Sequence, residues 1–101
     1  MPDFITVCKE ADLPAGTARK VQLAGKDIAI YNIAGKFYAT QQECLHRQGP
    51  LDEGELENTT VTCPWHGWQY DVTTGESLFN RAQKLQTYAV KVEGGEIKVA
   101  V

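Results

Sequence analysis

Hydrophobic and polar residues alternate with a period of two along the N-terminal part of the chain, a pattern typical of β-strands. In the first such run, Phe4, Thr6 and Cys8 alternate with Ile5 and Val7. Glycine-containing turns separate this run from the next ones, which favours antiparallel hairpins. The pattern predicts strands at 3–9, 27–33 and 36–40, a β-rich run at 21–23, and turns at 13–16, 24–26 and 34–35.

The C-terminal end carries the clearest hairpin signal. Residues 87–92 and 97–101 are rich in alternating valine and isoleucine, and the Glu-Gly-Gly-Glu turn at 93–96 connects them. No segment keeps a helical repeat over three turns, and the best candidate for a helix is the short stretch 10–13. The prediction is therefore an all-β fold, a small antiparallel sandwich or barrel in which the two ends of the chain pair.

The stretch 41–84 between these hairpins has weaker strand signals. It contains both histidines, both tryptophans and two of the three cysteines. A long, weakly regular insert on a rigid β frame is the usual place for a functional site. We therefore expect a single domain, 1–101, that carries its chemistry in a subdomain at about 41–84.

Composition narrows the possible functions further. The chain has 101 residues, 43% of them hydrophobic, and 10 basic against 13 acidic residues give a formal net charge of −3. These values suit one globular domain and offer no basic stripe for nucleic acid. No apolar run approaches the roughly 18–20 residues that span a membrane, and the N-terminus does not resemble a signal peptide. We therefore expect a cytoplasmic protein with reduced thiols, no membrane association and no nucleic-acid partner.

Two short motifs in the insert suggest a metal site. They are Cys44-Leu45-His46 and Cys63-Pro64-Trp65-His66, and they hold all the histidines of the chain. Thiolate and imidazole groups at such short spacing, beside turn-forming Gly49-Pro50 and Gly67, can converge on one metal. From the spacing alone, a zinc site and an iron–sulfur site remain equally open.

The surrounding residues resemble the two cluster-binding loops of Rieske [2Fe–2S] proteins. The resemblance rests on 44–51 (CLHRQGPL), on 63–71 (CPWHGWQYD) and on Thr74-Gly75-Glu76, and it extends from Phe4 to Val101. It implies one [2Fe–2S] cluster per chain rather than zinc. It also implies that Cys44 and Cys63 bind one iron and that His46 and His66 bind the other.

The resemblance also implies a function. The chain is similar to the ferredoxins of bacterial ring-hydroxylating dioxygenases, which suggests a one-electron carrier between a flavin-containing reductase and a terminal oxygenase. It is too short for an added mononuclear-iron domain and contains no G-x-G-x-x-G dinucleotide motif, so we expect no enzyme activity of its own. The alternatives are an electron-transfer subunit working with a nitrite reductase large subunit, and a zinc-stabilised binding module.

Departures from the respiratory Rieske pattern bear on the reduction potential. Gly49 and Trp65 stand where respiratory proteins carry a disulfide, and Trp68 stands where they carry a serine that donates to the cluster. Fewer donors to the cluster favour the low end of the Rieske range, about −150 to +300 mV. In addition, 79–83 contains no proline where the family usually has a proline-rich covering loop.

Three further expectations concern residues outside the ligand set. We expect Trp65 and Trp68 to cap the core beneath the loops and Cys8 to be a packed thiol. The acidic residues between the motifs are expected to form a solvated loop; they are Asp52, Glu53, Glu55 and Glu57.

Overall fold

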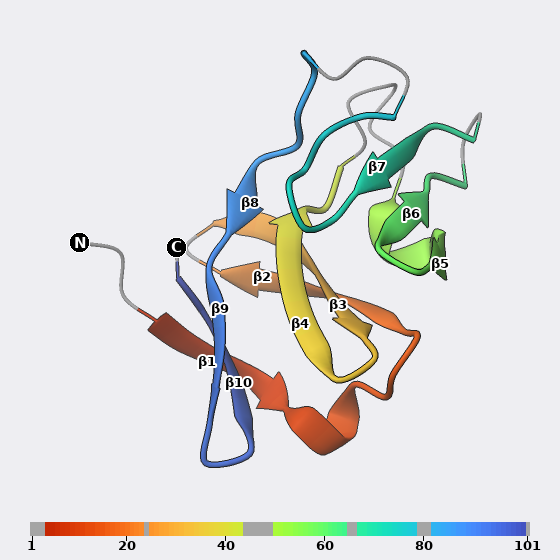
Figure 1. The fold of residues 1–101 in the computed structure, drawn as a ribbon. Helices are drawn as coiled ribbons and strands as arrows, with labels where there is room; N and C mark the ends of the chain where they lie inside the picture. Colours follow the sequence, from red (N-terminus) through yellow and green to blue (C-terminus); the bar gives the residue numbers. More distant parts are fainter. Residues whose placement is uncertain (1–3, 24, 44–49, 65–66, 79–81, 101) are drawn as a thin grey trace.

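The computed structural model describes residues 4–23, 25–43, 50–64, 67–78 and 82–100 (Figure 1). This part of the chain folds into three antiparallel sheets and two short 3-10 helices and contains no α-helix, which confirms the all-β prediction. Its helices include none long and apolar enough to cross a membrane.

The three sheets take their strands from different parts of the chain. The terminal sheet has the order β1-β10-β9 and comprises β1 (Phe4–Lys9), β9 (Val90–Glu93) and β10 (Glu96–Ala100). The central sheet has the order β2-β3-β4-β8 and comprises β2 (Ala18–Leu23), β3 (Lys26–Ile33), β4 (Lys36–Gln41) and β8 (Thr87–Tyr88). The insert sheet has the order β5-β6-β7 and comprises β5 (Glu55–Glu57), β6 (Thr60–Thr62) and β7 (Gln69–Asp71).

The two ends of the chain pair in the terminal sheet, as the hairpin pattern predicts. Phe4 lies opposite Ala100, and the register then shifts at a bulge between Thr6 and Cys8. The strict alternation expected for this strand is therefore wrong beyond Thr6. Val7 and Cys8 both pack against the core beneath the sheet, because a bulge re-aims the residues that follow it.

Strand β3 is buried on both faces and divides the interior into two cores. Ile28 and Ile30 belong to the terminal core, which also includes Ile97 and Val99 of β10. Ala29 and Tyr31 alternate with them along the strand and belong to the insert core. This double burial explains the nearly continuous apolar run of β3, and it lets one rigid strand support the insert.

Several predicted boundaries differ from the structure. The run at 87–92 is two strands, because the chain leaves β4 at Ala89 and joins the terminal sheet as β9. Strand β2 begins at Ala18 rather than Val21. The short helix expected at 10–13 is a 3-10 helix, η1 (Glu10–Asp12). The insert also contains a second 3-10 helix, η2 (Leu51–Glu53), and a complete sheet that its weak strand signals do not predict.

Candidate functional site

The second Cys–His motif begins where strand β6 ends. Cys63 directly follows β6, and its backbone N–H donates to the carbonyl oxygen of Trp68 at 2.7 Å. The next pair, Thr62 and Gln69, continues the register of β6 with β7. The pair Cys63 and Trp68 therefore closes the base of a hairpin, and Gly67 has a φ of 71° that favours glycine.

The described residues on either side of the first motif are also paired. Glu43 and Pro50, which flank residues 44–49, form an antiparallel bridge. The N–H of Leu51 donates to the carbonyl oxygen of Gln42 at 2.9 Å, which extends the closure by one residue on each side. The chain thus enters and leaves the segment that carries Cys44 and His46 at adjacent points.

The closed ends of both loops rest on the same insert core. Leu51, at the exit of the first loop, and Cys63, at the start of the second, are buried members of that core. Gly54 lies against the backbone of Thr62, so closely that an added Cβ would overlap the Thr62 carbonyl oxygen. A hollow lies between these stems, lined by 53–55 on one side and by Cys63, Pro64 and Gly67 on the other.

A third segment is fastened beside the second loop. The N–H of Leu78 donates to the carbonyl oxygen of Gln69 at 3.0 Å, and the N–H of Ser77 donates to that of Gln83 at 2.9 Å. Ser77 and Gln83 are therefore paired on either side of residues 78–82, and Leu78 is attached to the start of β7. This segment includes most of the proline-free stretch 79–83, of which residues 79–81 lie outside the described part of the chain.

The candidate ligands are only partly described by the structure. Cys63 is buried, with 1% of its surface exposed, and lies at the stem of the second loop. Cys44, His46 and His66 lie outside the described residues, so their convergence stays a prediction. Two thiolates and two imidazoles fit the iron–sulfur group that the motifs imply, because Rieske clusters use this donor set. The loop closures and the position of Cys63 are consistent with it.

Other predicted residues lie largely as expected. Trp68 is half-buried and packs against the insert core, and Tyr70 is fully buried within it. Trp65 lies outside the described residues. Cys8 packs against the terminal core instead, and burial raises the pKa of its thiol. This environment suits a packed residue rather than a ligand of the insert site.

The acidic stretch between the motifs differs from the expected loop. Asp52 and Glu53 belong to η2, and Glu55 and Glu57 belong to β5. The three glutamates are exposed, whereas Asp52 is partly buried and accepts a hydrogen bond from the side chain of Gln42. Short-range patterns do not show this pairing, because the partners are ten positions apart in the sequence.

Sequence reasoning also missed the consecutive glutamines that precede the first motif. The Gln41 side chain donates to the carbonyl oxygen of Glu43 at 2.7 Å and accepts from the N–H of Gln86 at 2.9 Å. Gln41 therefore connects the approach to the first loop with the segment that precedes β8. The only sequence signal is the position of both glutamines between a predicted strand and the first cysteine.

The chain is similar in sequence to one family of proteins and to several of its members. Residues 3–89 match the family model described as the Rieske [2Fe–2S] domain. The 3-phenylpropionate/cinnamic acid dioxygenase ferredoxin subunit of Shigella flexneri is 40% identical over 95 residues, which cover 92% of this chain and 89% of the relative. The ferredoxin component of the naphthalene 1,2-dioxygenase system of Pseudomonas aeruginosa is 35% identical over 89 residues, covering 87% and 86% of the two chains.

A solved structure agrees with these sequence relatives. A chain in the complex of reduced oxygenase and oxidized ferredoxin in carbazole 1,9a-dioxygenase superposes with a TM-score of 0.89 and 34% identity. The match covers 96% of this chain and 92% of the other. The likeness therefore extends over nearly the whole length of both chains.

Proposed function

The chain belongs to the Rieske [2Fe–2S] family, and from this premise we propose that Cys44, His46, Cys63 and His66 bind its cluster. In this assignment Cys44 and Cys63 bind one iron, and His46 and His66 bind the other. The observation that carries the proposal is the pair of closed loops, in which each Cys–His motif is fastened at its base above a common core.

The protein residues prepare the site in two ways. The closures at Gln42–Leu51 and Cys63–Trp68 bring the ends of each ligand loop together, which lowers the entropy lost when the ligands are ordered. The insert core beneath them, which includes the fully buried Tyr70 and Leu51, provides a packed, apolar support. When bound, the cluster supplies a one-electron redox couple, and imidazole ligation raises its potential above that of four-thiolate clusters.

The chain is an electron carrier rather than a catalytic enzyme. Its relatives are ferredoxin components of dioxygenase systems, and the matches cover most of both this chain and each relative. We propose a terminal oxygenase as the electron acceptor, because the carbazole dioxygenase complex contains a structurally similar ferredoxin with its oxygenase. We propose a flavin-containing reductase as the electron donor. These relatives favour this assignment over a role beside a nitrite reductase large subunit.

Reconstitution tests this function directly. The purified protein would be combined with the flavin-containing reductase and the terminal oxygenase of a naphthalene or phenylpropionate dioxygenase system, with NADH as reductant. We expect reduction of the carrier followed by oxygenase turnover that depends on its concentration. Reduction without any transfer to the oxygenases would contradict the proposed acceptor, whereas a failure of all electron uptake would contradict the carrier function.

A further inference from the structure

Gln42 is a deeply buried polar residue at the entrance to the first ligand loop. It directly follows β4 and precedes Cys44 by two positions, and only 5% of its surface is exposed. Glutamine is seldom buried to this degree, because its amide must then find partners within the protein. The partners of Gln42 therefore indicate what its burial achieves.

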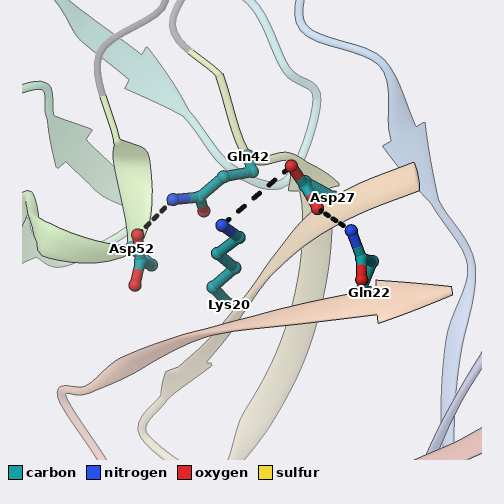
Figure 2. Close-up of polar contacts among 5 residues, drawn as sticks. All are labelled: Lys20, Gln22, Asp27, Gln42 and Asp52. Atoms are coloured by element: carbon teal, nitrogen blue, oxygen red, sulfur yellow. Dashed lines mark hydrogen bonds and ion pairs between the residues drawn. The ribbon is translucent and has the colours of Figure 1, made fainter. Parts of the chain in front are cut away.

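The polar groups of Gln42 connect three segments of the chain. Its N–H donates to the carbonyl oxygen of Asp27 at 3.1 Å, beside the start of β3, and its own carbonyl accepts from Leu51 at 2.9 Å. Its side-chain Nε2 donates to the carboxylate of Asp52 (Figure 2). Gln42 is thus bonded to two consecutive residues on the far side of the first loop, to Leu51 through the backbone and to Asp52 through the side chain.

One polar atom of Gln42 has no partner within the part of the chain that the structure describes. Among the described residues, the Oε1 atom of Gln42 is buried without a hydrogen-bond partner. Such an atom lowers stability, whereas an apolar side chain of similar shape would avoid the cost. The bond from Nε2 to a carboxylate is of the stronger, charge-assisted kind, and it restricts the orientation of the side chain.

From this geometry we infer that Gln42 is a positioning residue for the cluster, an inference that rests on the ligand assignment proposed above. The bond from Gln42 to Asp52 adds a side-chain contact to the backbone pairing that joins the two ends of residues 44–49. In the proposed site it holds the entry and exit of this ligand loop beside the stem that carries Cys63. Gln42 binds no metal itself and acts only through the loop.

The chain offers a matched control for this contact. The Nε2 atom of Gln22 donates to the carboxylate of Asp27 at 3.1 Å, which is the same amide-to-carboxylate chemistry in the central sheet (Figure 2). This second pair is exposed, and it lies between β2 and β3 rather than at a loop closure. Methionine is similar in length to glutamine but has no amide. Replacing either glutamine with methionine therefore removes the hydrogen bond without changing the net charge.

The first test compares Gln42→Met with Gln22→Met in the purified, cluster-containing protein. We expect Gln42→Met to shift the midpoint potential, to change the paramagnetic resonance signal of the reduced form, and to lose its cluster severalfold faster than the unaltered protein. Because the charge is unchanged, a shift of the potential reports the geometry of the site. We expect Gln22→Met to match the unaltered protein in all three measurements.

A second pair of variants covers the case in which Gln42→Met does not fold. In the Asp52→Asn variant, the new amide can still accept from Nε2 of Gln42 and can donate to its Oε1. We therefore expect this variant to retain the resonance signal and the cluster lifetime of the unaltered protein. Asp52→Ala removes the contact, and we expect rapid cluster loss. Normal signal, potential and lifetime in Gln42→Met, or identical behaviour of the two Asp52 variants, would overturn the inference. An unaltered protein that binds no cluster would instead overturn the proposed function.

Discussion

The backbone N–H of Cys63 lies 2.7 Å from the carbonyl oxygen of Trp68, and this hydrogen bond closes the second ligand loop at its first residue. The bond from Leu51 to Gln42 has the equivalent place at the first loop. In both cases the closing bond joins two backbone groups at the base of a loop. The following predictions separate the roles of these loop stems from the roles of the ligands.

Replacing Cys63 with alanine should remove the cluster, whereas replacing Cys8 should not. Cys63 begins the second motif, and metal binding is coupled to the order of its ligand loop. Cys8 packs in the terminal core, so Cys8→Ala should cost only about 1 kcal/mol of unfolding free energy. Visible absorbance and iron content measure the first effect, and urea unfolding measures the second. Loss of the cluster in Cys8→Ala would contradict this division of roles.

The substitution Gly54→Ala should separate the two loop stems. Its Cβ would overlap the carbonyl oxygen of Thr62, so relief of the clash must move η2 away from β6. We expect a loss of about 3 kcal/mol of stability, at the upper end for overpacking, together with faster cluster loss.

Gly94→Ala is the control for this variant. Gly94 lies in the turn between β9 and β10, has a φ of 61° and meets nothing within 4 Å of an added Cβ. Its left-handed backbone should cost about 1 kcal/mol, with no change in the rate of cluster loss. Equal cluster lifetimes in the two variants would show that contact between the stems does not matter for the site.

Gly94 and Gly54 also show which parts of the fold can be predicted from the sequence and which cannot. The hairpin around Gly94 was predictable, because valine and isoleucine alternate on both sides of a Glu-Gly-Gly-Glu turn. The contact of Gly54 with Thr62 was not, because β5 and β6 have three residues each and no local pattern specifies their partners. Similarly, the motifs identified Cys63 as a candidate ligand, whereas the role of Gln42 depends on bonds to distant segments.

Tyr31 should remain protonated in the folded protein well above the ordinary pKa of tyrosine. Burial raises the pKa of this phenol, whose hydroxyl also pairs with Thr40 Oγ1 at 2.9 Å. An unfolded chain releases this proton near pH 10, so above about pH 10 folding stability should fall by about 1.4 kcal/mol per pH unit. Below about pH 10, Tyr31 is protonated in both the folded and the unfolded protein, so it causes no loss of folding stability there.

Tyrosinate absorbance tests this expectation when the unaltered protein is compared with Tyr31→Phe. The amplitude that titrates near pH 10 in the folded state should be the same in both proteins. On unfolding at high pH, the unaltered protein should gain one more phenolate than the variant. A smaller folded-state amplitude in Tyr31→Phe would mean that Tyr31 ionises normally.

The reduction potential should lie in the lower part of the Rieske range, below about 0 mV. Trp68 has no hydroxyl to donate to the cluster, and its half-buried ring packs against the insert core instead. Fewer donors stabilise the more negative reduced state less strongly. Protein-film voltammetry at neutral pH gives the midpoint. A value above about +150 mV would mean that other donors outweigh the missing ones.

The central claim is that one [2Fe–2S] cluster per chain, held by two cysteines and two histidines, carries one electron. Its most direct test is a reductive titration of the purified protein followed by electron paramagnetic resonance and calibrated against protein concentration. We predict that one electron per chain produces one unpaired spin per chain, with a rhombic signal of low average g typical of mixed thiolate and imidazole ligation. A colourless protein that holds one zinc ion and takes up no electron, even after expression with added iron, would contradict the claim.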